Sequence, residues 1–312
     1  MRFLVTGGAG FIGSALVREL VAQAHDVVIY DDFSRGRRDF VPADARISFV
    51  EGDIRDRARV ERAVRDHAPE RVVHLAALHF IPDCNARPRD TLEINVGGTQ
   101  NVLDACARQR VARVLYASSA AVYAPSDTAC QELSSALGPN DVYGQSKLQG
   151  EELARRYHAD TGLDVSMLRI FNAIGPRETN PHVLPHVLES LRTSDTIALG
   201  NTEAKRDYID TRDLARAIAV IAEKARGLSV YNVGTGRAHS VADILDLLRR
   251  QLGRPLTVAV DPARLRPSDN PLLLADVTKI RTELGWTPSV TLEDAVDELI
   301  RYYGIRIGPA GA

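Results

Sequence analysis

Tyr143 and Lys147 stand four residues apart, a spacing that places both side chains on one face of a helix. An ammonium group beside a phenol stabilises the phenolate. The pair therefore predicts a tyrosine whose pKa is lowered towards neutrality and that acts as a general acid or base. Ser119 follows a strand expected at 112–117, at the edge of the sheet where ligands bind in open parallel folds. We predict Ser119, Tyr143 and Lys147 as catalytic residues, with Ser119 and Tyr143 on the same substrate oxygen.

A glycine-rich segment, TGGAGFIG at 6–13, stands between the first expected strand and the first expected helix. Glycines let the backbone turn tightly and approach a pyrophosphate, which then rests on the helix N-terminus. The segment therefore predicts a dinucleotide site that includes Gly7, Gly10, Phe11, Ile12 and Gly13.

Two acids, Asp31 and Asp32, end the second expected strand, about 20 residues after the glycine segment, where a carboxylate can accept both hydroxyls of an adenosine ribose. Such a carboxylate repels a 2′-phosphate, so Asp31 favours NAD over NADP. Two nearby arginines, at positions 35 and 37, keep NADP as an alternative. Ser34 belongs to the same predicted cofactor region. Asp53 and Ile54, after the third strand, are either an adenine contact or a simple turn.

The elements that must position these residues alternate between short apolar runs and longer helical segments. Strands are expected at 2–5, 26–30, 47–50, 71–75, 112–117 and 164–170, with helices at 12–24, 57–66, 91–109 and 143–161. Strands that are apolar throughout and separated by helices predict a doubly wound parallel sheet, an α/β Rossmann fold.

The second half of the chain is expected to add a smaller unit. Helices are expected at 186–193, 211–224, 240–252 and 292–303, and strands at 196–199, 229–233 and 256–260. We expect a cofactor-binding domain at 1–171, to which 206–234 returns. A smaller C-terminal substrate-binding domain is expected from 172–205 and 235–312.

The composition excludes several classes of protein. The 312 residues carry 39 basic and 41 acidic side chains, a net charge of −2, and phosphate-backbone binding needs a basic excess, so we expect no nucleic-acid partner. No apolar run reaches membrane-spanning length, and no signal peptide is expected. Three widely spaced cysteines argue for a reducing, cytoplasmic setting and against a metal. Only four basic residues are lysines, which singles out Lys147.

Several separate motifs occur in an order that resembles the extended short-chain dehydrogenase/reductases acting on nucleotide sugars, of the UDP-glucose 4-epimerase-like type. Besides the glycine segment and the Tyr143/Lys147 pair, they are His74–Ala77, Asn95–Thr99, Ser118–Ser119, Arg206–Ile209, Arg266–Asp269 and Leu284–Pro288. The resemblance implies a nucleotide-diphosphate sugar substrate and an NAD cofactor. It adds to the cofactor site Leu75, Ala76, Ala77, His79, Asn95 and Ser118, together with Tyr143 and Lys147.

The resemblance also implies which residues hold the substrate. Asn172, Arg206 and Arg266 would bind the diphosphate, because guanidinium groups match phosphate oxygens. His182 stands where an asparagine is common in UDP-galactose-type epimerases, which leaves the sugar and the base open. Leu273 falls where that family has a side chain that gates substrate size, and a leucine there would admit an N-acetylhexosamine.

The reaction is narrowed by two alanines that follow Ser119. In the resembling 4,6-dehydratases an Asp-Glu pair stands where this chain has Ala120 and Ala121, and decarboxylating or 3,5-epimerising members carry Glu or Cys at the second position. A methyl group can neither donate nor accept a proton. The remaining chemistry is a redox-neutral 4-epimerisation in which NAD stays bound. An NADPH-dependent 4-ketoreductase and a non-catalytic NAD-binding protein remain as alternatives.

The helices expected at 91–109 and 143–161 resemble the pair that forms a four-helix dimer interface in this family. Their apolar faces would equally serve packing within one chain. We expect a homodimer.

Overall fold

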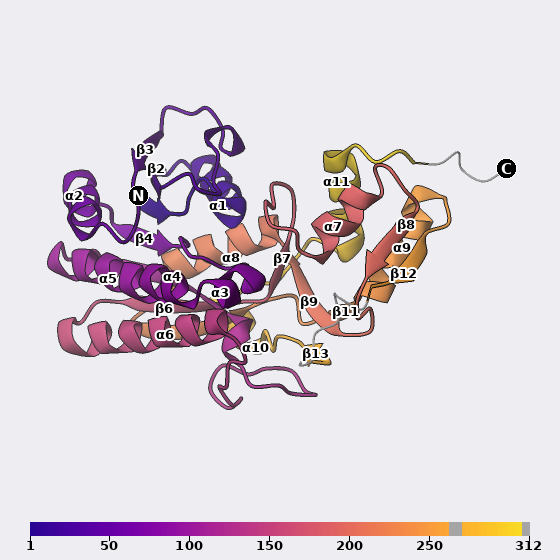
Figure 1. The fold of residues 1–312 in the computed structure, drawn as a ribbon. Coiled ribbons are helices and arrows are strands. Elements are labelled where there is room, and N and C mark those ends of the chain that lie inside the picture. Colours follow the sequence, from indigo (N-terminus) through magenta and orange to yellow (C-terminus); the bar gives the residue numbers. More distant parts are fainter. Residues whose placement is uncertain (262–269, 308–312) are drawn as a thin grey trace.

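The computed structural model describes residues 1–261 and 270–307, and its largest element is a parallel sheet (Figure 1). Seven strands follow the order β10-β6-β5-β4-β1-β2-β3. They are β1 (Arg2–Thr6), β2 (Asp26–Asp31), β3 (Ile47–Glu51), β4 (Arg71–His74), β5 (Arg113–Ser119), β6 (Val165–Ile170) and β10 (Leu228–Val233). Every neighbouring pair in this sheet is parallel.

Helices cover both faces of the sheet. On one face lie α1 (Phe11–Ala22) and α8 (Thr211–Lys224), and on the other lie α2 (Arg57–His67), α5 (Thr99–Arg108) and α6 (Val142–Thr161). Successive strand residues such as Leu4 and Val5 point to opposite apolar clusters and are both buried, which explains why apolar residues predominate on both faces of the strands. The predicted doubly wound α/β fold is confirmed.

The helix expected at 91–109 is interrupted by a wider turn. The observed segment runs from α4 (Pro88–Leu92) through a π-helical stretch, η2 (Glu93–Gly98), into α5. At Gly98 a β-carbon would lie 2.5 Å from the terminal methyl of Ile54, so the glycine lets η2 pack against the turn after β3. A π-helical insertion inside a helix frequently marks a functional site, and Asn95 lies in this one.

The second unit has its own small sheets and core. A four-stranded sheet contains β7 (Asn172–Ile174), β9 (Lys205–Asp210), β11 (Ala238–Ser240) and β13 (Leu272–Leu273), and a separate pair contains β8 (Thr196–Leu199) and β12 (Thr257–Val260). A third apolar cluster lies among its helices. The remaining helical elements are α3 (Ile81–Ala86), α7 (Val183–Ser190), α9 (Val241–Leu252), α10 (Thr278–Leu284), α11 (Leu292–Tyr303), η1 (Arg38–Phe40) and η3 (Ala120–Val122).

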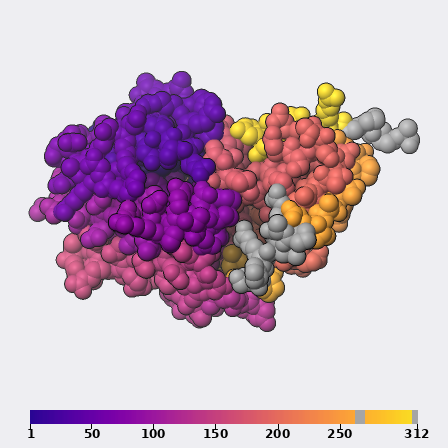
Figure 2. Space-filling view, viewed as in Figure 1, coloured from indigo at the N-terminus to yellow at the C-terminus, as the bar shows by residue number. Residues whose placement is uncertain are grey.

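Six elements were not expected from the sequence, and α7 begins three residues earlier than expected. The six are β7, β9, β11, β13, α3 and α10. Three of these strands have only two or three residues, too few for a periodic pattern to be recognised. The expected return to the main sheet is made by β10, whereas β9 pairs with the strands of the smaller unit. In the space-filling view the two units meet across the middle of the molecule (Figure 2).

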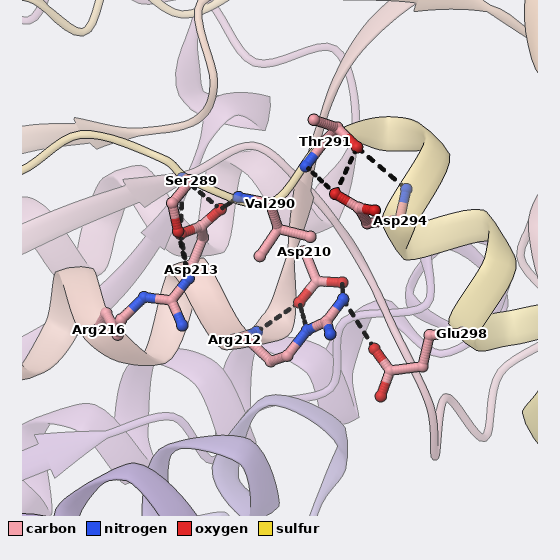
Figure 3. A network of polar contacts seen from close by, with 9 residues as sticks. All are labelled: Asp210, Arg212, Asp213, Arg216, Ser289, Val290, Thr291, Asp294 and Glu298. Atoms are coloured by element: carbon pink, nitrogen blue, oxygen red, sulfur yellow. Dashed lines mark hydrogen bonds and ion pairs between the residues drawn. The ribbon is translucent and has the colours of Figure 1, made fainter.

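A polar network joins the start of α8 to the segment that precedes α11 (Figure 3). The fully buried carboxylate of Asp213 accepts hydrogen bonds from the backbone amides of Ser289 and Val290, the latter at 2.7 Å. One residue before Asp213, Arg212 lies between Asp210 and Glu298, at 2.9 Å and 2.8 Å from their carboxylate oxygens. These bonds fix the smaller unit against the main sheet, because they link residues far apart in the sequence.

Two further features concern the hydropathy of the helices and the state of the cysteines. In residues 1–261 and 270–307, no helix has both the length and the apolar character needed to cross a membrane. All three cysteines are buried free thiols.

His74 at the end of β4 gives the fold a pH dependence. Its ring is buried between the hydroxyls of Thr6, at 2.7 Å, and Thr99, at 3.0 Å. Burial, with a smaller contribution from the charge of Lys147, lowers the pKa of His74 to about 3. The unfolded chain therefore binds more protons between pH 6.5 and about pH 3, so the stability present above pH 6.5 is lost on acidification.

We expect the free energy of unfolding to fall as the pH drops from 6.5 to 4.5, with His74 contributing up to about 1.4 kcal/mol per pH unit. A His74→Gln variant should have a lower starting stability but a shallower pH slope, by about one proton. Urea unfolding at several pH values measures both slopes. Equal slopes in the two proteins would contradict this assignment.

Candidate active site

The glycine segment after β1 forms a cradle against the loop after β4. Gly7 has a φ of +70°, and a β-carbon there would lie 2.8 Å from the backbone nitrogen of Ala76. A β-carbon on Gly13 would lie 2.1 Å from the Gly7 carbonyl oxygen, so only glycine allows α1 to pack this closely. Gly10 caps α1 without a side-chain hydrogen bond, which leaves the first-turn amides of the helix to bind an anion.

The other residues predicted for the cradle surround this turn. Phe11 and Ile12 form the first turn of α1 and are half-buried. Leu75, Ala76 and Ala77 follow β4 and are half-buried as well. The backbone amide of Leu75 donates to the carbonyl of Thr6 at 3.1 Å. The structure therefore brings both predicted loops together, and they fit the pyrophosphate of a dinucleotide.

Asp31 ends β2 beside the cradle. Its carboxylate is buried and accepts hydrogen bonds from the backbone amides of Ala9, at 3.0 Å, and Phe33, at 2.9 Å. Burial raises the pKa of Asp31, and these two bonds oppose the rise. Because each carboxylate oxygen accepts more than one hydrogen bond, Asp31 retains the capacity to bind ribose hydroxyls.

The residues after Asp31 bear on the choice between NAD and NADP. Asp32 accepts bonds from the amide and hydroxyl of Ser34, at 2.9 Å and 2.7 Å, so this predicted pair forms a local turn. The two arginines that left NADP as an alternative cofactor both form ion pairs. Arg35 pairs with Asp83 at 2.8 Å, and Arg37 pairs with Asp39 at 2.7 Å. A 2′-phosphate would have to displace these ion pairs.

Asp53 and Ile54, in the turn after β3, both have side chains that contact other residues of the chain. Asp53 pairs with Arg55 at 2.5 Å, and the hydrogen bond from that arginine lowers the pKa of Asp53. Ile54 is buried in an apolar cluster of the main sheet. The residues therefore form a turn, in which the Asp56 amide donates to the Asp53 carbonyl at 3.1 Å, and the adenine contact stays a prediction.

The predicted catalytic residues lie together at the carboxyl edge of the sheet. Asp141 caps α6 by accepting from the amide of Gly144 at 2.7 Å, which fixes the start of the helix one residue before Tyr143. Lys147 lies one turn further along α6. Ser119, the last residue of β5, hydrogen-bonds the side chain of Tyr143.

The predicted pKa of Tyr143 is wrong for this structure. Burial raises it to about 12, although the bond with Ser119 acts in the opposite direction. Burial outweighs the stabilisation expected from Lys147, whose Nζ donates to the Ala117 carbonyl at 2.7 Å and lies 5.8 Å from the centre of the Tyr143 ring. Burial lowers the pKa of Lys147 to about 8. Tyr143 thus holds its proton at neutral pH, next to a hydroxyl and a buried amine.

Two residues predicted to bind the cofactor use their side chains within the protein. The amide of Asn95 donates to the Leu78 carbonyl at 2.8 Å and to the Ser146 hydroxyl at 2.9 Å. It thereby ties the loop after β4 to α6. The hydroxyl of Ser118 donates to the buried carboxylate of Glu151 at 2.6 Å. Both side chains position the catalytic residues beside them.

The predicted substrate residues lie in or next to the smaller unit. Asn172 is exposed in β7, and Arg206 in β9 donates to the Asn270 carbonyl at 2.7 Å. Leu273 in β13 pairs with Arg206, so these two lie side by side. Arg266 lies outside the described residues.

His79 and His182 meet at the junction of the two units. Their rings lie 6.0 Å apart, with His79 from the loop after β4 and His182 at the start of α7. Burial lowers the pKa of His79 to about 4. Glu178 and Asn180 complete this group, and the sequence analysis missed both. The signal available in the sequence was that the segment 172–185 is rich in Pro, Asn and Gly and has no strand or helix pattern.

The chain is similar to known proteins in sequence and in fold. A model of the NAD dependent epimerase/dehydratase family matches residues 3–234. The chain belongs to this family. The predicted resemblance is therefore confirmed, and the match covers the whole main sheet together with the small-sheet strands up to β9.

Similar members of the epimerase/dehydratase family align over nearly the whole chain. The UDP-glucose 4-epimerase of Corynebacterium glutamicum is 34% identical, with 93% of this chain and 92% of that protein aligned. Among solved structures, UDP-glucose 4-epimerase from Brucella ovis in complex with NAD has a TM-score of 0.90 at 32% identity, over 98% of this chain and 99% of the other. UDP-N-acetylglucosamine 4-epimerase from Methanobrevibacter ruminantium M1, in complex with UDP-N-acetylmuramic acid, has a TM-score of 0.88 at 28% identity, over 97% of both chains.

Proposed function

We propose that this chain is an NAD-dependent 4-epimerase of a nucleotide-diphosphate hexose. When bound, NAD supplies the acceptor and donor of the hydride at C4. Tyr143 exchanges a proton with the 4-hydroxyl of the sugar, and Ser119 hydrogen-bonds the same oxygen. The ammonium of Lys147 lies over the Tyr143 ring and stabilises the negative charge that the phenol acquires as it gives up its proton.

The observation that decides the reaction is the pair of methyl side chains after Ser119. Ala120 is buried and Ala121 half-buried, and the amide of Ala121 donates to the Ser119 hydroxyl at 3.1 Å. These positions hold no group that donates or accepts a proton, so the acids and bases that the resembling dehydratases and 3,5-epimerases carry there are missing from this chain. Proton and hydride transfer at C4 is the chemistry that this site supports.

The cofactor site combines the glycine cradle with Asp31. The first-turn amides of α1 would hold the pyrophosphate, and Asp31 would accept the adenosine ribose hydroxyls. The substrate would be a UDP-hexose, glucose or galactose or their N-acetyl forms, as in the named relatives. Its diphosphate would be held by Asn172, Arg206 and Arg266. We assign cofactor binding to 1–171 with 206–234, and sugar binding to 172–205 with 235–312.

The test is turnover by the purified protein with no added cofactor. We expect UDP-galactose to be converted to UDP-glucose, followed by NMR, with NAD copurifying at close to one per active site. An NADPH-dependent 4-ketoreductase would instead consume added cofactor stoichiometrically. A protein that binds NAD and converts none of these sugars would overturn the proposed reaction.

Leu273 would decide whether an N-acetyl group fits beside Arg206. A Leu273→Tyr variant adds bulk at this position of β13, so we expect it to lose turnover of UDP-N-acetylglucosamine by at least about tenfold while UDP-glucose turnover is largely kept. Leu272→Tyr, on the neighbouring strand position, is the matched control. An unchanged ratio of the two rates in Leu273→Tyr would dispose of this gating role.

We infer a homodimer from a groove along α6 and the end of η2. Its lining includes Val96, Leu148 and Leu153, and apolar side chains at a surface groove favour burial against a partner. A Leu153→Arg variant is expected to sediment near the monomer mass of 34.1 kDa, and the wild type at twice that value. Leu133→Arg, at a side chain that is 83% exposed, should leave the dimer intact. Identical sedimentation of Leu153→Arg and the wild type would contradict this interface.

The buried free cysteines support a reducing compartment, the cytoplasm.

A further inference from the structure

We propose that His79, Glu178 and His182 form a binding site for a first-row transition-metal dication of the zinc and cobalt class. One ligand atom from each residue lies within 4.8 Å of the other two. Among the described residues this is the one group of three or more His, Cys, Asp or Glu side chains that meets this condition. His79 and His182 are also predicted to contact the cofactor and the substrate, but that prediction gives no role to Glu178 and does not explain why the three side chains converge.

The donor set has the chemistry of a catalytic zinc site. Two imidazoles and one carboxylate are ligands that zinc and cobalt bind, with metal–nitrogen distances of about 2.0–2.1 Å and a fourth position left open. In a tetrahedral site the ligand atoms are about 3.3 Å apart. The widest separation in the group must therefore close by up to about 1.5 Å, whereas Nε2 of His182 already lies 3.9 Å from a carboxylate oxygen of Glu178. His182 is 43% exposed and lies at the edge of the group, so rotation of its ring supplies much of this closure.

The two inner ligands are already oriented. The ring of His79 donates to the backbone carbonyl of Ala77, which leaves Nε2 as the nitrogen with a lone pair. That Nε2 lies 3.0 Å from the side-chain amide of Asn180. The same amide lies 3.2 Å from a carboxylate oxygen of Glu178, whose side chain is only 6% exposed. The Asn180 amide thus holds both acceptor atoms towards one point, and a cation that binds them would displace this amide.

The position of the group gives the metal a structural consequence. His79 comes from the loop after β4, whereas Glu178 and His182 lie between β7 and α7. The backbone next to His79 is held by Asn95, whose amide also bonds Ser146 in α6 beside Lys147. A cation at this site would therefore join the two units close to the catalytic helix. Because it binds only the folded chain, it would raise the unfolding temperature.

The test uses Co²⁺ and Zn²⁺ alone on tag-free protein that has been treated with a chelator, with no sugar present. We expect one Co²⁺ per chain, a visible absorption band typical of four- or five-coordinate cobalt, and loss of that band when Zn²⁺ is added. Glu178→Gln and His182→Ala should each weaken Co²⁺ binding by at least about tenfold. His239→Ala, at a half-buried histidine in β11, should bind as the wild type does.

Circular dichroism establishes that each variant is folded. If Glu178→Gln fails to fold, His182→Ala decides the question, since its side chain is the most exposed of the three. The proposal is overturned if the wild type takes up no Co²⁺ at micromolar concentration, or if both variants bind as tightly as the wild type does. Since the assay contains no substrate, its outcome is separate from that of the proposed epimerisation.

Discussion

Replacing Tyr143 by phenylalanine is expected to lower kcat by about 10²–10⁴-fold, the usual contribution of a general acid or base. The substitution removes only the hydroxyl that hydrogen-bonds Ser119 and that exchanges a proton with the sugar in the proposed reaction. The ring and the start of α6 remain, because the helix is capped by Asp141. Initial rates of UDP-galactose conversion, with bound NAD quantified in the same samples, measure the effect.

Tyr157→Phe is the matched control for this variant. It makes the same change on the same helix, and its hydroxyl bonds Asp104 at 2.6 Å, away from the catalytic residues. We expect it to keep the wild-type rate. Wild-type turnover by Tyr143→Phe with full NAD content would exclude the proposed role of Tyr143.

The second large effect is expected for stability, at an ion pair beneath the site. Arg169 in β6 and Glu151 in α6 are 1% and 0% exposed and form two hydrogen bonds, at 2.9 Å and 2.8 Å. Burial alone would lower the pKa of Arg169, but its bonds with Glu151 outweigh this and raise it. Glu151 also accepts the hydroxyl of Ser118, so the pair fixes the end of β5 where Ser119 lies.

Removing Arg169 leaves the buried Glu151 carboxylate with only a longer ion pair, to the partly exposed Arg155 at 3.5 Å. We therefore expect Arg169→Met to lower the free energy of unfolding by about 3–5 kcal/mol. The double variant Glu151→Leu/Arg169→Met should be less destabilised than Arg169→Met alone, because no buried charge remains. Urea unfolding at pH 7 gives these values.

Asp160→Asn breaks an exposed pair with Arg156 on the same helix and serves as the control. Exposed pairs contribute at most about 1 kcal/mol, so this variant should change little. A double variant as unstable as the sum of its single variants would show that the two charges do not compensate each other.

The sequence predicted the main sheet because each layer there has a strong local signal. Strand β1 has the apolar run Phe3-Leu4-Val5 at its centre and β2 the run 27–29, and the helices between the strands have one buried face. The glycine cradle was also predictable, since Gly7 requires a positive φ and Gly13 a close approach. In both cases one local rule decides the structure.

The features that were wrongly predicted or missed depend on contacts between residues that are far apart in the sequence. The π-helical turn around Asn95 arises from packing of Gly98 against Ile54 and from bonds to Leu78, which no local period reveals. The pKa of Tyr143 depends mainly on how deeply the folded chain buries its hydroxyl. The i, i+4 spacing correctly placed both residues on one face of the helix. It could not show that the Lys147 ammonium donates a hydrogen bond to the Ala117 carbonyl. Glu178 and Asn180 gain their meaning only from His79, about a hundred residues earlier in the chain.

The most direct test of the central claim follows the hydrogen at C4. UDP-galactose and UDP-N-acetylgalactosamine deuterated at C4 would each be incubated with the protein as purified, in ordinary water and without added cofactor. We predict many turnovers per chain of at least one of them to its 4-epimer, with the deuterium retained at C4, because the same hydride returns to the opposite face. Loss of deuterium from C4, or turnover that requires stoichiometric NADH or NADPH, would contradict a redox-neutral 4-epimerase.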